Sequence, residues 1–235
     1  MNRKSVHRKR TIAARALIVA VAIACLGALA VSSSARTTSG SSASDTITWG
    51  DNHPDATTLN PFTQYDEGIF IFQNVYETLT NGGAGGSVTP GLATSWKQTG
   101  PKTWVFQLRH GVRFSNGRVM VANDVVTSFR YFLPSTYGFL VAPAVKATAV
   151  GKYAVRFDLS QPSIAFPAQV ETLLVLPGKE LRNGTLKTAT QAIGTGPYMI
   201  KSHIPNVSWT LTANPYYWQK GFPAVKNLVI RLFSD

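Results

Sequence analysis

The N-terminal segment limits the fold of this chain more than any other feature, because a basic run is followed directly by an apolar run. Six of the 23 Lys and Arg residues lie in the first fifteen positions, and residues 16–31, ALIVAVAIACLGALAV, carry no charge. A basic n-region before an apolar h-region is typical of an export signal. We therefore predict a signal peptide over residues 1–31, an exported protein, and a folded domain that begins downstream.

The processing of this signal has three interpretations, which the sequence leaves open. Residues 28–30, ALA, fit the small-residue pattern of signal cleavage, whereas residues 22–25, AIAC, resemble a bacterial lipobox that would place a lipid on Cys25. An uncleaved membrane anchor is the third interpretation. Cys25 is the single cysteine, so we expect no disulfide and no cysteine nucleophile in the exported part.

Residues 32–45, SSSARTTSGSSASD, predict a linker, because a Ser/Thr/Gly-rich stretch cannot bury enough apolar surface to repay ordering it. Outside the first fifteen positions, 17 basic residues face 11 acidic residues, a net charge of about +6 without a basic run. We therefore expect no nucleic-acid partner.

Residues 46–235 predict one domain that mixes strands and helices. The two kinds of segment do not alternate strictly and no repeat is present, which favours an α/β or α+β fold over a barrel or a helix bundle. We predict a strand at 46–49, a helix at 66–80 ended by the glycines that follow Asn81, a hairpin at 103–114, a helix at 122–133, a hairpin at 145–159, a helical segment at 164–174, and strands at 198–201, 208–213 and 228–232.

The sequence contains no motif typical of an enzyme. The patterns G-x-S-x-G, H-E-x-x-H, S-x-x-K and G-x-x-x-x-G-K-[ST] are all absent. The four histidines are too far apart to form a ligand pair by spacing, and His53 reads as a solvated loop residue. We predict no catalytic residue, no metal site and no cofactor.

Residues 193–200, IGTGPYMI, contain the G-x-G that begins a dinucleotide-binding fingerprint, but Pro197 follows where a helix should start. A phosphate cradle needs free backbone N–H groups, and proline has none. We instead predict a turn in which Gly194 or Gly196 has a positive φ and allows close backbone approach. The aromatic residues 214–218, NPYYW, are predicted to cap the sheet rather than to stack on a sugar or a base.

Three segments taken in order resemble a known family. LNPFTQYDEGIFIFQNVYETLT begins at Leu59, VTPGLATSWKQTGPKTWVFQLRHGVRFSNGRVMVANDVVTSFRY at Val88, and IGTGPYMIKSHIPNVSWTLTANPYYWQKGFPAVKNLVIRLF at Ile193. Together they are similar to the successive signatures of the family 5 solute-binding proteins of ABC importers, the oligopeptide, dipeptide and nickel group. The resemblance runs from about Thr46 to Asp235.

This resemblance implies a periplasmic-binding-protein-like type II fold, of which the sequence would hold lobe one with its extra subdomain and lack the second lobe. Family members close two lobes around a peptide or similar small solute and deliver it to an ABC permease. A single lobe cannot close, so weak or no binding is expected of this chain alone. Two alternatives stay open, a truncated lobe without function and an envelope enzyme.

The family also implies where a ligand would lie. The loop after the first strand forms the mouth of the cleft, a tyrosine after the second predicted helix approaches peptide ligands, and the glycine segment borders the ligand through its backbone. The candidate ligand-lining residues are Gly50, Asp51, Asn52, Tyr137, Gly194, Thr195 and Gly196.

The chain departs from the family at Val121, where a threonine commonly caps the helix before Asp124. Loss of this side-chain acceptor should cost about 0.5–2 kcal/mol of helix stability unless Asn123 or another group replaces it.

Overall fold

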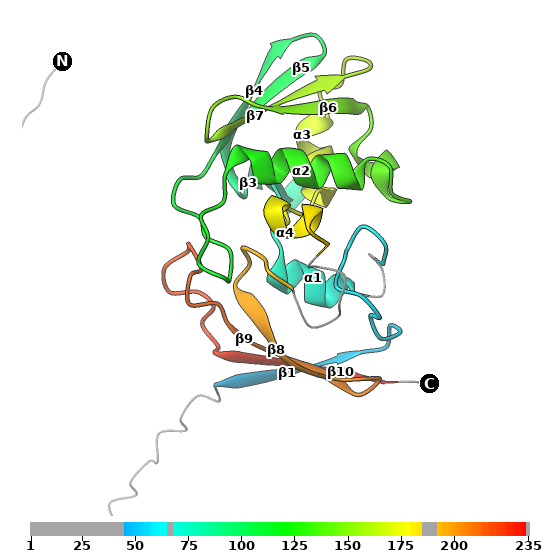
Figure 1. Cartoon of the computed structure of the whole chain (residues 1–235), viewed down its shortest axis with the longest axis vertical. Coiled ribbons are helices and arrows are strands. Elements are labelled where there is room, and N and C mark those ends of the chain that lie inside the picture. Colours follow the sequence, from blue (N-terminus) through cyan, green and yellow to red (C-terminus); the bar gives the residue numbers. More distant parts are fainter. Residues whose placement is uncertain (1–44, 65–67, 185–191, 234–235) are drawn as a thin grey trace, which may run out of the picture. The chain divides into compact units, whose positions relative to one another are not determined.

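The computed structural model describes residues 45–64, 68–184 and 192–233. The predicted signal peptide with Cys25, and the linker apart from Asp45, lie outside the described residues. The chain divides into two units, residues 1–40 and 41–235, and every described residue belongs to the second (Figure 1). No described helix combines the length and the apolar character needed to cross a membrane.

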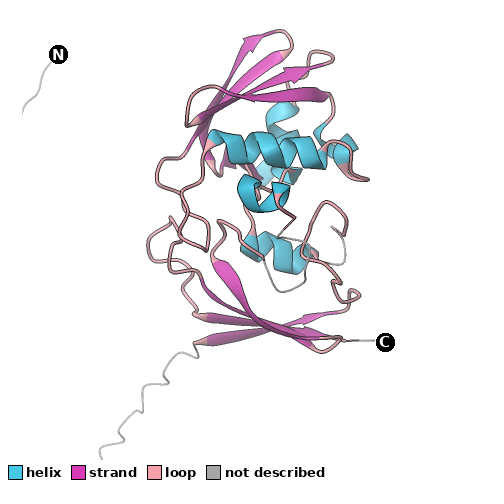
Figure 2. Ribbon diagram, in the orientation of Figure 1, coloured by secondary structure: helices cyan, strands magenta, loops and turns pink. Residues whose placement is uncertain are grey.

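The described part contains two four-stranded sheets and a short two-stranded ribbon (Figure 2). In the first sheet, β1 pairs in parallel with β10, while the other neighbours are antiparallel. The first sheet has the order β1 (Thr46–Asp51), β10 (Asn227–Leu232), β9 (Ser208–Ala213), β8 (Tyr198–Ile204); the second has the order β4 (Ala93–Gly100), β5 (Thr103–Leu108), β7 (Ala154–Leu159), β6 (Ala144–Ala149); the ribbon pairs β2 (Thr80–Gly82) with β3 (Val88–Pro90).

The helices pack against both sheets. Helix α1 contacts β8 of the first sheet, whereas α2 contacts β6 and β7 of the second. In the core, Phe106, Phe157 and Phe166 meet in edge-to-face pairs, the arrangement that aromatic quadrupoles favour. The helices are α1 (Ile69–Val75), α2 (Ala122–Phe132), α3 (Phe166–Gln169) and α4 (Gly178–Arg182), with 3-10 turns at Ala84–Gly86, Gly138–Val141 and Val170–Thr172.

Several predicted elements are confirmed. The helix at 122–133 is α2, the hairpin at 145–159 is β6 and β7, and the last three strands are β8, β9 and β10. Along β7, Val155, Phe157 and Leu159 are buried while Arg156 is exposed, as the alternation indicates. The segment at 164–174 contains two short helical pieces rather than one helix.

The helix predicted at 66–80 is wrong in its second half. Among the described residues α1 ends at Val75, and Asn81 and Gly82 belong to strand β2. Val75 O, which a longer helix would pair with the N–H of Leu79, accepts the N–H of Gly196 instead. Beyond it, Glu77 O binds the N–H of Val175, and Leu79 O binds those of Gly91 and Ala93. Tertiary hydrogen bonding therefore overrides the helical spacing of the apolar residues.

The hairpin predicted at 103–114 is also wrong in its pairing. Strand β5 pairs with β4, which precedes it, and with β7. Residues 112–120 form a separate small hairpin, in which the N–H of Met120 donates to Val112 O and the N–H of Phe114 donates to Arg118 O. The turn residues at Gly111 and Gly117 do have positive φ, but only Gly117 lies at the tip of a hairpin.

The IGTGPYMI segment leads into the first sheet, but not through a positive φ. Neither Gly194 nor Gly196 is among the residues with positive φ, so that part of the prediction is wrong. Close approach is confirmed, because a Cβ on Gly194 would lie 1.8 Å from Val75 O and a Cβ on Gly196 would lie 2.6 Å from Asn74 O. The glycines are needed because a side chain would overlap the backbone of α1.

The start of α2 keeps one half of a capping box. Val121 provides no side-chain acceptor, so the N–H of Asp124 donates to Val121 O, while Asp124 Oδ2 accepts the Val121 N–H at 2.9 Å. The other oxygen, Asp124 Oδ1, accepts the N–H of Gly178 at 2.8 Å, which joins α4 to α2. Arg118 completes the cluster with two hydrogen bonds of 3.1 and 2.8 Å to the same carboxylate.

Candidate functional site

The carboxyl ends of β1 and β10 meet at one edge of the first sheet, because the two strands run in parallel with Asp51 opposite Leu232. The N–H of Phe233 donates to Asp51 O and continues this pairing past the end of β10. Ligands of open α/β sheets bind outside the carboxyl ends of the strands. The predicted residues Gly50, Asp51 and Asn52 lie at this edge.

The three residues differ in what they offer to a ligand. Gly50 lies against the ring of Phe233, whose Cε2 would be 2.9 Å from an added Cβ. Asp51 is buried, and its Oδ1 accepts the N–H of His53 at 3.0 Å and lies 2.6 Å from His53 Nδ1. Asn52 is exposed and lines a pocket. Of these three residues, Asn52 is the one that lines that pocket.

The pocket beside Asn52 has a volume of about 220 Å³. Asp55 holds in place the loop after β1 that lines this pocket. Asp55 Oδ2 lies 2.7 Å from His203 Nε2 and accepts the N–H of Asn206 at 2.8 Å, while Oδ1 accepts Trp209 Nε1–H at 2.7 Å. The rings of His203 and Trp209 stack at 3.6 Å. The loop is therefore anchored to β8 and β9. The lining residues are Asn52, His53, Pro54, Asp55, Asn206, Leu232 and Phe233.

Sequence reasoning missed Asp55 and His203. Their contact joins positions 148 residues apart, and neither stands in a recognisable motif. The one sequence feature that could have drawn attention to Asp55 was its place in a polar loop directly after a strand. The anchoring follows from the pairing of β8 with β9, which brings His203 opposite Trp209.

The other predicted residues lie elsewhere. Tyr137 is partly buried against the core before the turn at 138–141, and it does not line the pocket beside Asn52. Gly194, Thr195 and Gly196 are all buried. The N–H of Gly196 donates to Val75 O at 2.9 Å, so the glycine segment packs on the end of α1. The structure does not bring these residues together with Asn52.

The glycine segment instead borders a carboxylate. Glu77 accepts Trp218 Nε1–H at 3.0 and 3.1 Å and the Tyr217 hydroxyl at 3.3 Å. The guanidinium of Arg109 lies 4.0 Å from the centre of the Trp218 ring, so one face of this predicted cap is covered. Thr195 lies beside Glu77 and is buried, but its hydroxyl makes no hydrogen bond of ordinary geometry with a described residue.

Burial raises the pKa of Glu77 from 4.5 to about 7. The nearby Thr195, Trp218 and Tyr217 groups and the charge of Arg109 act in the opposite direction but do not cancel the effect of burial. Burial, followed by the negative charge of Glu77, also raises the pKa of Tyr217. The Tyr217 hydroxyl therefore stays a hydrogen-bond donor at neutral pH.

The raised pKa of Glu77 predicts a pH-dependent stability. Between about pH 4.5 and 7 the folded state holds a proton that the unfolded state has released, so the free energy of unfolding falls as the pH rises through this interval. Glu77→Gln removes this titration. We therefore expect the free energy of unfolding of the variant, relative to that of wild type, to be larger at about pH 8 than at about pH 5. Urea unfolding followed by tryptophan fluorescence at both pH values measures this. Glu171→Gln controls for the loss of one negative charge. If the stability difference between Glu77→Gln and wild type is the same at both pH values, Glu77 does not have a raised pKa.

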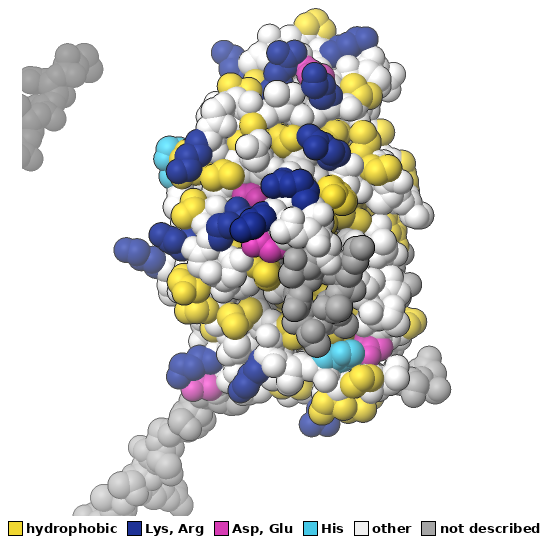
Figure 3. Space-filling view, viewed as in Figure 1, with side chains coloured by type: hydrophobic (Ala, Val, Ile, Leu, Met, Phe, Trp, Pro, Cys, Tyr) yellow, Lys and Arg dark blue, Asp and Glu magenta, His cyan; other side chains and the backbone are white. Residues whose placement is uncertain are grey.

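Positive side chains are spread over the visible face of the molecule and are interrupted by apolar and acidic ones (Figure 3). In the described part of the chain, no group of three His, Cys, Asp or Glu side chains is placed to hold a metal ion. The site at the sheet edge is a pocket formed by loop residues and strand ends.

Comparisons with known proteins place this fold. Residues 87–235 match the bacterial extracellular solute-binding proteins, family 5. The chain is 30% identical over 188 residues to the nickel-binding periplasmic protein of Escherichia coli, covering 75% of this chain and 35% of that protein. The structure of NikA from Brucella suis in complex with Fe(III)-EDTA has a TM-score of 0.69 at 28% identity and covers 80% of this chain and 40% of that one.

The Escherichia coli murein tripeptide binding protein MppA has the same fold, with a TM-score of 0.72 at 20% identity over 80% of this chain and 42% of that one. The chain thus spans about 35–42% of the length of these relatives. The fold is that of part of a periplasmic binding protein, as the resemblance implies. Because the match covers more than half of its residues, the chain belongs to the family 5 bacterial extracellular solute-binding proteins.

Proposed function

We propose that this chain is a ligand-capturing lobe of a solute-binding protein that serves an ABC importer. It would hold a peptide or similar small solute outside the cytoplasmic membrane and pass it to the permease. The observation that carries this proposal is the family 5 match on a domain whose strand ends form an open pocket. Export would use the basic and apolar segment at residues 1–31, with Cys25 as the candidate lipidation site.

The pocket geometry supports a binding mechanism with two lobes. Sites for small ligands usually enclose about 300–1,000 Å³, and the pocket beside Asn52 encloses about 220 Å³. It would supply one wall, and a second lobe would supply the other and exclude water on closing. Asn52 would contact the ligand, while Asp55 would hold the loop against β8 and β9.

The relatives support the ligand class without fixing it. The names of two of them describe binding of nickel and of a murein tripeptide. A peptide or similar small solute is the class that we propose for this chain. We propose Tyr137 and the segment from Gly194 to Gly196 as further candidates for bordering the ligand when a second lobe closes over it.

Calorimetric titration of the 235-residue chain with di- and tripeptides tests the two-lobe mechanism. We expect a dissociation constant weaker than about 1 μM, or about −8 kcal/mol, because one wall cannot bury a ligand. We also expect chromatography to recover the peptide unchanged. Submicromolar affinity would contradict the need for a second lobe, and consumption of the peptide would show an enzyme.

A further inference from the structure

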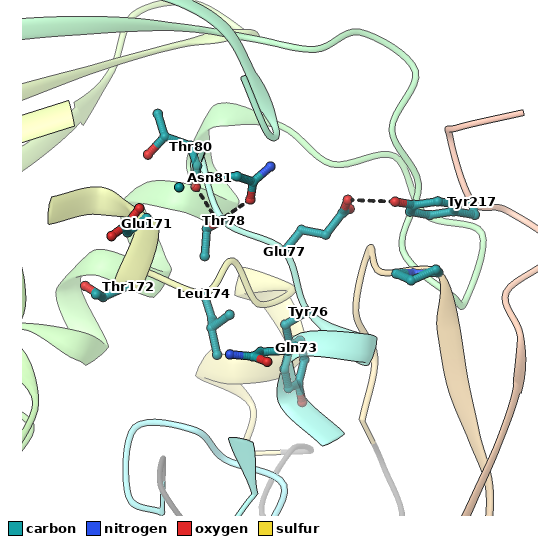
Figure 4. A pocket seen from close by; sticks show the side chains of 12 residues that line it. Gln73, Tyr76, Glu77, Thr78, Thr80, Asn81, Glu171, Thr172, Leu174 and Tyr217 are labelled. Carbon is teal, nitrogen blue, oxygen red and sulfur yellow. Dashed lines mark hydrogen bonds between the residues drawn. The ribbon is translucent and has the colours of Figure 1, made fainter. Parts of the chain in front are cut away.

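A second cavity lies away from the sheet edge and shares no lining residue with the pocket beside Asn52. Its volume is about 550 Å³, within the range of sites for small ligands. It is bounded by the end of α1, by β2, by the 3-10 turn Val170–Thr172 and by Tyr217 from the segment after β9 (Figure 4).

The charged side chains that line this cavity are both acidic, Glu77 and Glu171. Figure 4 shows them on either side of Thr78. Basic residues outnumber acidic ones in the whole chain, so the negative wall does not reflect its overall charge. Glu77 is held by Trp218 and Tyr217, whereas Glu171 is exposed.

Two neutral polar residues on the wall, Thr78 and Asn81, use donors within the chain and keep acceptors for a ligand. The hydroxyl of Thr78 donates to Thr80 O at 2.7 Å, which leaves its lone pairs for another donor. Asn81, which also lines the cavity, donates its amide N–H to Pro90 O at 3.4 Å, and its Oδ1 accepts the Thr78 hydroxyl at 3.3 Å and keeps a lone pair for another donor. A ligand that matches this wall carries several N–H donors and positive charge.

We propose that this cavity binds a small organic cation with primary ammonium groups, such as an aliphatic diamine. An ammonium group has three donors and no acceptor, so it suits carboxylates flanked by hydroxyl and amide oxygens. A divalent metal suits the wall less well, since no described group of three acidic or histidine side chains is placed to hold one. This inference goes beyond the proposed function, because the site needs neither the sheet edge nor a second lobe.

Binding at this site is linked to a proton. Glu77 has a pKa of about 7 in the empty cavity, raised by burial, and a bound cation favours its charged form. The groups that face Glu77 are Tyr217 and Trp218 from the segment after β9, Thr195 from the glycine segment and Arg109 from the end of β5, with Glu171 across the cavity. The affinity therefore rises, and protons are released, between about pH 6 and about pH 8.

The test is a calorimetric titration of the 235-residue chain with putrescine at about 0.15 M salt, where charges on the open surface are largely screened. We expect saturable binding at one site, an affinity that increases with pH, and no binding of 1,4-butanediol. Glu171→Gln should weaken binding about tenfold, the usual effect of losing one charge-assisted hydrogen bond. Because Glu171 is exposed, this variant is expected to fold.

Two further variants decide the assignment. Asp158→Asn removes one negative charge from β7, outside the cavity, and should leave the affinity unchanged. Glu77→Gln should abolish the dependence on pH. Absence of saturable putrescine binding, equal affinity in wild type and Glu171→Gln, or an equal loss in Asp158→Asn would overturn the proposal. The peptide titration concerns the other pocket, so either proposal can fail without the other.

Discussion

Replacing Gly194 with alanine is expected to destabilise the folded chain by about 3 kcal/mol or more, the upper part of the range for overpacking. The added Cβ would lie 1.8 Å from Val75 O and 2.6 Å from Val75 C, and both are backbone atoms that cannot rotate away. Moving them would also stretch the hydrogen bond from Gly196 N–H to Val75 O. Thermal unfolding followed by circular dichroism should show a midpoint lowered by about 6–12 °C, or a chain that does not fold.

Gly100→Ala is the matched control for this substitution. The nearest atom to its added Cβ is Thr103 Oγ1 at 3.7 Å, an ordinary contact, and Gly100 has no positive φ. Alanine there should leave the stability unchanged or raise it by about 0.4–1 kcal/mol, because it restricts the unfolded chain. Equal midpoints for the two variants would show that the backbone of α1 yields without cost.

Asp124→Ala should lower the free energy of unfolding by about 3 kcal/mol, the lower end of the range for breaking a buried ion pair. Its carboxylate is buried and accepts hydrogen bonds from Arg118, from the N–H of Val121 and from the N–H of Gly178. Alanine leaves these donors without their partner in a largely buried cluster. The lower end applies because the Arg118 side chain is 30% exposed and water can reach it.

Asp158→Ala supplies the comparison, since Asp158 also pairs with an arginine. Arg156 Nη2 lies 2.7 Å from Asp158 Oδ1, but the Arg156 side chain is 50% exposed. Surface pairs contribute about 0–1 kcal/mol, so this variant should unfold at nearly the wild-type urea concentration. If the two variants lose equal stability, the four hydrogen bonds of Asp124 do not join α2 to α4 in the way described.

Local pattern was sufficient to predict α2 and the hairpin of β6 and β7. Their periodicity agrees with their burial, and their partners lie nearby in sequence. Pattern failed at residues 76–82, where the apolar spacing is helical. The structure there depends on hydrogen bonds from the N–H groups of Val175 and Gly196, which lie more than ninety residues away. Such long-range partners cannot be predicted from the local sequence.

The sheet edge could be predicted in part. Asp51 and Asn52 follow a β-branched strand, so their place at its end was readable from the sequence. The anchoring of Asp55 by His203 and Trp209 depends on strand register, which no spacing encodes. The raised pKa of Glu77 likewise arises from burial in the folded chain, which outweighs the opposing effect of side chains from three separate segments.

The hydrogen bond between Gly196 N–H and Val75 O places the two ends of the segment 76–195 next to each other. Residues 76–195 leave the body of the first sheet and return to it at neighbouring points of the backbone. Insertions are tolerated where their two ends lie close together. The second sheet with its helices therefore has the topology of an inserted module, which could be exchanged between lineages while the order of strands in the first sheet stays the same.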